Sequence, residues 1–185
     1  MLKGFFGHLR TVGRHRRLVR KGCFKIGLYM QGLTHDLSKY SPAEFWPGVK
    51  YYQGVRSPNV AQRRTIGYSP AWLHHKGRNK HHFEYWTDYN ESTDQFAVPV
   101  KMPRKYVAEM IMDRIAACKV YKKNEYTDAC AYEYLHKRDP VSMFHPDTYK
   151  ELDYALTLLK DKGEAALYDY LKNEYLKKPT RQQGE

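Results

Sequence analysis

A recurring helix-start signal constrains the fold of this chain more than any other feature of its sequence. Serine is followed by proline at three places, Ser41-Pro42, Ser57-Pro58 and Ser69-Pro70. Serine is a favoured N-cap residue, and proline suits the first helical position because its missing N–H would have no partner there. Alternating period-2 runs bounded by hairpin turns are hard to find. The sequence therefore predicts an all-α fold of seven to nine helices in a single bundle.

The expected helices cover most of the chain. The segments that read as helical are residues 3–32 with a break near Gly22 or Gly27, 45–52 with a kink at Pro47, 71–76 closing at Gly77 or Asn79, 104–121, 128–137 capped by Thr127, 147–161 and 164–177. Residues 87–101 read as a polar loop, either a lid or a plain connection. We expect a core over residues 1–125, C-terminal helices over 126–178 packed on that core as the same domain or a small extension, and a flexible tail at 179–185.

Composition places the chain in a broad class. Its 185 residues suit one domain, and 42% of them are hydrophobic. Mean hydropathy is −0.80, and no apolar run approaches the length of a membrane span. The N-terminus lacks the apolar stretch of a secretion signal, and three scattered cysteines form no CxxC pair. These features predict a cytoplasmic protein with reduced thiols.

Positive charge is concentrated at the N-terminus. The net charge is +12, and residues 1–25 contribute eight basic side chains and no acidic one. A basic helix of this kind attracts phosphate, nucleic acid or acidic lipid. The same run is also consistent with a solvated helix face that aids solubility, and the sequence leaves both interpretations open.

Histidine is unevenly distributed as well. Four of the nine histidines, His74, His75, His81 and His82, fall within nine residues, and the pair His35-Asp36 lies upstream. Histidine is the commonest protein ligand for transition metals. The cluster predicts a metal site assembled from several helices, with a polar His-rich loop as the alternative.

Helix periodicity places further polar residues on apolar faces. His15 shares a face with Val12 and Val19, so it is expected to point toward the core. His8 lies on the same face about 10 Å away, which is too far for both to bind one metal, so it is expected to support the site, to be structural or to face substrate.

Asp113 falls on the apolar stripe of the helix expected over residues 104–121. A buried carboxylate needs a charge partner or a metal. A metal is the favoured partner, and an ion pair with Arg104 or Arg114 is the alternative.

His35 and Asp36 are adjacent in sequence. Neighbouring helical residues diverge by about 100°, which is close to the angle between neighbouring positions of an octahedron. Both side chains are therefore expected to reach one metal. Mixed histidine and carboxylate ligation suits Fe, Mn, Co, Ni or Zn in an open site.

In this order, the candidate ligands resemble a known pattern. His15, then His35-Asp36, then the histidine cluster and finally Asp113 resemble the HD-domain superfamily of all-helical, metal-dependent phosphohydrolases. Three segments within residues 8–121 resemble more closely a family of uncharacterised bacterial and phage proteins related in pattern to HD domains. These segments are 35–45 (HDLSKYSPAEF), 71–86 (AWLHHKGRNKHHFEYW) and the helix of 102–119.

The resemblance implies a role for each matching residue. His15, His35, Asp36 and Asp113 would hold one divalent transition-metal ion, and His75, His81 and His82 would add a second. Asp36 and Lys39 would be catalytic, with Lys39 contacting phosphate beside Lys76, Arg78 and Lys80. The interval from His35 to His74 is longer than in many HD domains, so the assignment within each histidine pair stays open.

Three functions fit these expectations. The leading one is a metal-dependent phosphohydrolase acting on a small phosphorylated substrate, a nucleotide among the candidates. The resemblance also allows a di-iron, oxygen-activating enzyme on the same fold. The third is a non-enzymatic, metal-stabilised module whose basic N-terminal helix binds nucleic acid or an acidic partner.

Overall fold

The structure, a computed structural model, describes residues 2–177, and this part of the chain is predominantly helical. Its α-helices are α1 (Leu2–Lys25), α2 (Tyr29–Thr34), α3 (Pro42–Lys50), α4 (Pro58–Ile66), α5 (Pro70–Lys76), α6 (Arg104–Lys122), α7 (Cys130–Arg138) and α8 (Pro146–Tyr170). Short helices are η1 (Leu37–Tyr40), η2 (Phe83–Tyr85), η3 (Lys123–Glu125), η4 (Val141–Met143) and the π-helical η5 (Leu171–Tyr175). The predicted all-α class with seven to nine helices is confirmed for the described residues.

The serine-proline signals mark real helix starts. α3, α4 and α5 begin at the three prolines. Ser69 Oγ also accepts a hydrogen bond from Trp72 N at 3.1 Å, as an N-cap should. Among the described residues, the hydroxyls of Ser41 and Ser57 make no such cap bond. Proline at the first turn is thus the feature that all three starts share.

The first long helical stretch breaks where glycine allows it to. Gly27 has φ of 83°, a left-handed conformation that costs glycine little, and it separates α1 from α2. Gly22 stays inside α1 and serves packing instead. A Cβ atom at this position would lie 2.6 Å from Met112 Sδ, so glycine lets α1 and α6 approach closely.

One hydrophobic core joins the N-terminal and C-terminal helices. Val19 of α1, Ile111 of α6, Leu135 of α7 and Leu156 of α8 are fully buried in the same cluster. The C-terminal helices therefore pack on the core that α1 and α6 form. α8 kinks at Gly163, which matches the expected division between two C-terminal helices. The tail expected at 179–185 lies outside the described residues.

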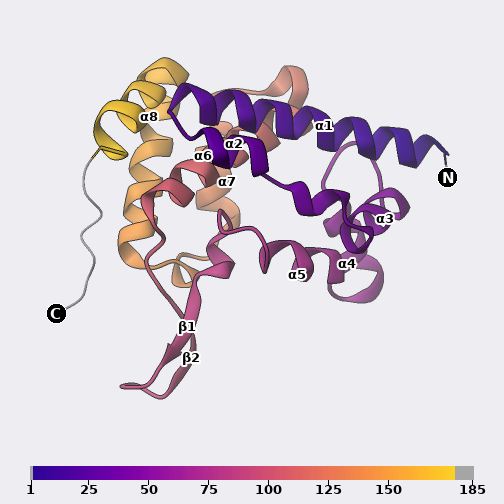
Figure 1. Ribbon diagram of the computed structural model, residues 1–185, viewed down its shortest axis with the longest axis horizontal. Coiled ribbons are helices and arrows are strands. Elements are labelled where there is room, and N and C mark those ends of the chain that lie inside the picture. The colour runs from indigo at the N-terminus through magenta and orange to yellow at the C-terminus, as the bar shows by residue number, and fades with distance from the viewer. Residues whose placement is uncertain (1, 178–185) are drawn as a thin grey trace.

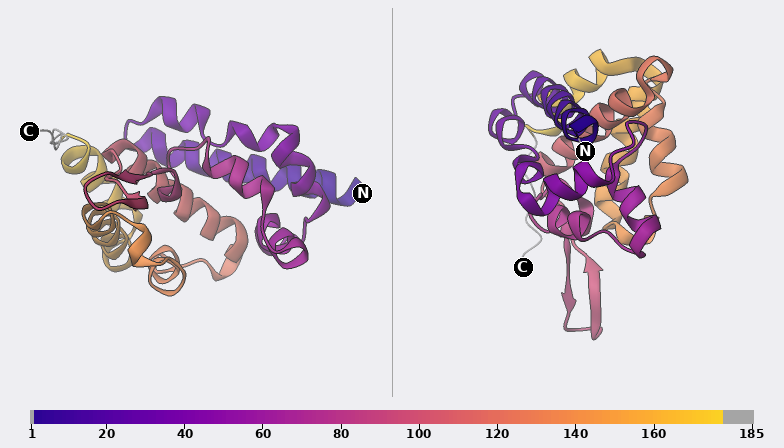
Figure 2. Two further views of the ribbon diagram at one scale, coloured as in Figure 1. Left: turned by 90° about the horizontal axis from the view of Figure 1, so that it is seen from below. Right: turned by 90° about the vertical axis from the view of Figure 1, so that its right-hand side faces the viewer.

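The segment expected to be a loop forms a β-hairpin, so that expectation was wrong. β1 (Thr87–Asn90) pairs antiparallel with β2 (Gln95–Pro99). Neither strand buries a full face, so no period-2 alternation of apolar residues marks them in the sequence. The hairpin projects from the helical body (Figures 1 and 2).

The helices divide between two ends of an elongated body. α1 runs along one edge with α2 beside it, α3 to α5 gather at one end and α8 stands at the other (Figure 1). α6 packs along α1 and connects the two ends.

Truncation of a core residue tests this packing. We expect Leu156→Ala to lower the free energy of unfolding by about 2–5 kcal/mol, because it leaves a cavity in the shared core. Leu73→Ala, at a position that is 52% exposed, should change it by less than about 0.5 kcal/mol. Urea denaturation measures both, and similar losses would contradict the assigned core.

Candidate metal centre

His35 and Asp36 lie at a break between helices. α2 ends at Thr34, His35 is extended (φ −48°, ψ 126°) and Asp36 is left-handed (φ 56°) before η1 begins. The expectation that both residues sit on one helix is therefore wrong. The backbone turns between them, so both side chains face the same centre, with His35 Nε2 3.3 Å from Asp36 Oδ2.

The Asp36 carboxylate occupies the middle of this centre and is fully buried. Its Oδ1 atom lies 3.2 Å from His75 Nε2 and 3.5 Å from His81 Nε2. Its Oδ2 atom lies 3.4 Å from His15 Nε2 and is also close to His35. Each carboxylate oxygen thus faces a different pair of histidines.

Two sets of metal-type donors meet at this shared carboxylate. Within each set the donor atoms lie within 4.8 Å of one another. The first set is His15, His35, Asp36 and Asp113, and the second is Asp36, His75, His81 and His82. The structure therefore brings together all seven residues that the sequence suggested as ligands, from α1, the α2–η1 junction, α5, the turn after α5, and α6.

The polar atoms of this centre fit a metal better than they fit one another. Among the described residues, His81 Nε2 and His82 Nε2 are buried without a hydrogen-bond partner, and the Asp36 oxygens have charge contacts, the shortest of them to Lys39, but no hydrogen bond. Leaving such an atom unpaired costs about 1–3 kcal/mol. Lys39 Nζ, 2.6 Å from Asp36 Oδ2, provides charge but does not pair the histidines. The buried clusters could hold metal ions, and their mixed nitrogen and oxygen donors suit Mn, Fe, Co, Ni or Zn.

Two glutamates that the sequence did not mark as site residues orient the histidines. Glu109 Oε1 lies 2.9 Å from His35 Nδ1 and 3.1 Å from His81 Nδ1. Glu44 Oε2 lies 2.7 Å from His75 Nδ1. A carboxylate on one ring nitrogen fixes the imidazole and leaves the other nitrogen for a metal. Glu109 could have been found one helical turn before Asp113, on the buried side of α6.

Contacts with Glu44 and Asp36 distinguish His74 from His75 as the metal-ligand candidate. His74 Nδ1 binds Glu44 Oε1 at 2.7 Å, and the His74 side chain is 22% exposed. His75 instead turns its Nε2 toward Asp36. Glu44 lies in the first turn of α3, three residues after Ser41, where a glutamate is typical of a capping box, but its carboxylate contacts these histidines. His81 and His82 lie in a turn rather than a helix, so both can join the second set.

Burial and charge shift the pKa values of these groups. Burial raises the pKa of Asp36, but His35 and Lys39 outweigh it and hold that pKa well below its usual value. Burial lowers the pKa of His35, but Asp36 and Asp113 outweigh it and raise that pKa. Burial lowers the pKa of His82 well below its usual value, so this ring is neutral, the form that binds metal. A metal bound at His35 would have to displace a proton.

Asp113 pairs with a histidine rather than with an arginine. Its Oδ1 atom lies 2.9 Å from His15 Nε2. Arg114 Nη1 lies 2.5 Å from Asp139 Oδ2, and Arg104 Nε lies 4.0 Å from Glu151 Oε1. The expected alternative, an ion pair between Asp113 and Arg104 or Arg114, is therefore not found among the described residues.

Arg16 ties α1 to the turn that carries the central residues. Its Nε donates to His35 O at 2.8 Å, and Nη2 donates to Leu33 O at 3.1 Å. One cation of the basic N-terminal run is thus structural.

A cleft of about 810 Å³ opens above the centre, with His15, His75, His82 and Asp113 in its lining. Of the four cations expected to bind substrate, only Lys39 lines this cleft, whereas Lys76, Arg78 and Lys80 do not. Five cations that the sequence did not single out line it instead: Arg56, Arg64, Lys122, Lys137 and Arg138.

His8 lines the same cleft but belongs to neither donor set. Its ring is buried beside the rings of Phe45 and Tyr52. Burial, and then the charge of Lys39, lower its pKa to about 4, so it is neutral near pH 7. Its place is structural and at the cleft wall.

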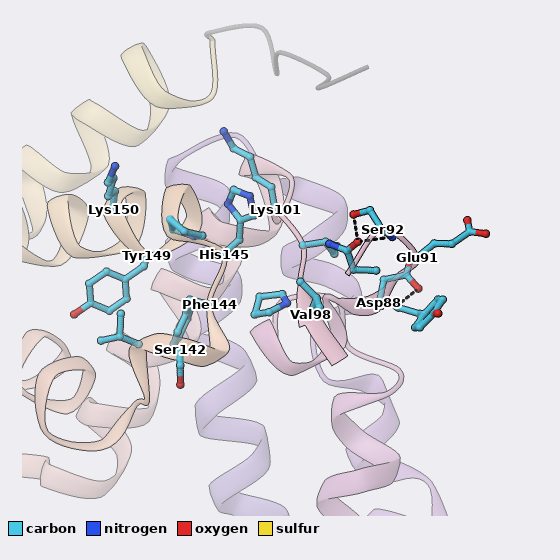
Figure 3. A pocket seen from close by; sticks show the side chains of 16 residues that line it. Asp88, Glu91, Ser92, Val98, Lys101, Ser142, Phe144, His145, Tyr149 and Lys150 are labelled. Carbon is cyan, nitrogen blue, oxygen red and sulfur yellow. Dashed lines mark hydrogen bonds between the residues drawn. The ribbon is translucent and has the colours of Figure 1, made fainter. Parts of the chain in front are cut away.

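A larger hollow of about 1110 Å³ lies elsewhere, between the hairpin and the start of α8. Figure 3 shows hairpin residues such as Asp88 and Val98 on one side and His145 and Tyr149 on the other. None of the residues that line it belongs to the donor sets found among residues 2–177. The chemistry-bearing side chains therefore gather at the smaller cleft.

Comparison with protein families places the chain in a group. Residues 4–158 match a family of unknown function, DUF5662, and the chain belongs to this family. The match runs from α1 into α8 and includes every residue of both donor sets. Searches of curated proteins and of solved structures found no match. Membership agrees with the resemblance to an uncharacterised family and adds no support for the HD-domain superfamily.

Removing the charge of Glu109 tests its role beside the histidines. We expect Glu109→Gln to weaken binding of Mn²⁺ or Zn²⁺ by about 10–100-fold, because the amide is a poorer acceptor for two imidazole groups. Competition with a chromogenic chelator measures the affinity. Glu133→Gln, an exposed position, is the matched control. Equal affinities in both variants would contradict the assigned role.

Proposed function

We propose that this protein is a metal-dependent phosphohydrolase with an HD-type centre that acts on a small phosphate ester. The observation that carries the proposal is the shared carboxylate of Asp36, between two histidine-rich donor sets and beside a cation-lined cleft. The order of these residues along the chain, which resembles HD domains, supports the same conclusion.

The ligands divide into two groups. His15, His35 and Asp113 would hold one divalent ion, and His75, His81 and His82 the other, with Asp36 between them. When bound, such ions polarise a phosphoryl oxygen and lower the pKa of a water molecule toward neutrality. Iron, manganese, zinc, cobalt and nickel all suit these donors.

Lys39 is placed to contact the substrate. Its ammonium group lies 2.6 Å from Asp36 Oδ2, and its side chain is 29% exposed and lines the cleft. It therefore connects the buried centre with the open space above it. A cation at this point would neutralise charge on the phosphoryl oxygens as the ester bond breaks.

The cleft supports a substrate larger than phosphate itself. Its volume of about 810 Å³ is in the range of small-molecule sites. Arg56, Arg64 and Lys122 would attract further negative charge. Trp72, whose ring centroid lies 4.7 Å from that of His82, offers an aromatic surface beside the centre. A phosphorylated compound with a flat ring, such as a nucleotide, fits these features.

Turnover of a panel of phosphate esters tests the proposal. We expect metal-loaded protein to release phosphate from at least one ester, and His35→Ala to lose metal and to lower kcat by about 100-fold or more, because a buried ligand is removed. His136→Ala is the matched control, since His136 is outside both donor sets and the cleft lining and pairs with Asp153.

Two results would contradict the hydrolase. Full activity of His35→Ala would remove the assigned site. Bound iron with oxygen uptake, and no release of phosphate from any ester, would favour the oxygen-activating alternative at the same residues.

A further inference from the structure

The outer face of α1 is a continuous cationic stripe. At about 100° per residue, its basic side chains project opposite the buried stripe of Val12, His15 and Val19. The exposed members of the stripe are Lys3, Arg10, Arg14, Arg17 and Lys21. Residues 1–25 contain no acidic residue, and among the described residues none of these five has a carboxylate partner. The stripe is thus available to an anionic partner.

An exposed apolar strip adjoins these cations. Leu2 is 76% exposed and Phe6 59% exposed, and with Leu9 they occupy the neighbouring sector of α1. α2 lies next to this sector of α1, because Arg16 on the same side of α1 donates a hydrogen bond to Leu33 O of α2. Met30 and Leu33 of α2 are exposed as well.

The pairing of charge with aliphatic side chains favours one class of partner. Cations attract phosphate groups of polynucleotides and of lipids alike. Single-stranded nucleic acid is bound by stacking on aromatic rings. Phe6 and Tyr29 offer such rings on this surface, but Leu2, Leu9, Met30 and Leu33, which have none, make up more of the exposed strip. Aliphatic groups do gain about 0.8 kcal/mol per buried CH₂ when they enter the acyl region of a bilayer.

We propose that the outer face of α1, together with α2, docks on an anionic membrane surface. The association would be peripheral, because no helix within residues 2–177 has the length and apolar character to cross a bilayer. α1 lies along an edge of the molecule (Figure 1). His15 is one of the residues on its buried face. The docked helix would therefore lie between the bilayer and the metal centre. This proposal does not depend on the chemistry of that centre.

Co-sedimentation with vesicles tests the proposal on the full chain. We expect binding to phosphatidylcholine vesicles with about 30% phosphatidylserine at about 0.1 M salt, and little binding to pure phosphatidylcholine. The double variant Arg14→Glu, Arg17→Glu should weaken partitioning about tenfold or more, since each cation near such a surface contributes about 1 kcal/mol. Leu2→Ser with Phe6→Ser should weaken it as well.

The controls separate this surface from net charge and from folding. Lys150→Glu with Lys172→Glu makes the same charge change at exposed positions of α8 and η5, and should leave binding unchanged. All substituted side chains are exposed, so the melting temperatures should stay close to that of the native protein.

Three results would overturn the proposal. The first is absence of binding to the anionic vesicles. The second is an equal loss of binding in the α8 control, which would assign the effect to net charge. The third is tight binding of duplex DNA or RNA that Leu2→Ser with Phe6→Ser leaves unchanged, without vesicle binding, which would identify a polynucleotide partner.

Discussion

The burial of the Asp36 carboxylate is the constraint on which the rest of the structure depends. A fully buried carboxylate is costly unless positive charge and hydrogen-bond donors surround it. His15 from α1, His75 from α5, His81 from the following turn, and Lys39 from η1 all converge on its two oxygens. The packing of α1 against α6 and the position of α5 therefore bring these side chains to one charged group. The fold and the candidate site are parts of the same arrangement.

Local signals in the sequence predicted much of this arrangement. Proline at a first helical turn gave the starts of α3, α4 and α5, because that preference depends on the backbone of a few residues. The apolar face around His15 and the chain order of the donors indicated the seven residues that the structure brings together. The β-hairpin was not predicted from the sequence, because neither strand is buried on a full face and so neither shows an alternation of apolar and polar residues.

The supporting residues could not be predicted in the same way. Glu109 acts through His35, which lies 74 positions away in the chain, and no local pattern encodes that contact. Glu44 has a local explanation as a capping residue, yet its carboxylate contacts His74 and His75. The cations that line the cleft come from α4, α6 and α7 and the segments beside them, so only the tertiary fold gathers them. Long-range contacts of this kind determine how the histidines are oriented and which of them join a donor set, whereas residue type indicates only which side chains are able to bind a metal.

The left-handed backbone of Asp36 has a consequence for how the residue can be replaced. At φ of 56°, aspartate and asparagine are tolerated far better than other residues with a side chain. The position is thus specified twice, once by its charge and once by its conformation. Alanine would remove the carboxylate and strain the turn together, and glutamate would keep the charge but meet the same backbone cost. Asparagine alone separates the two requirements, because it keeps the conformation and one oxygen while it removes the negative charge.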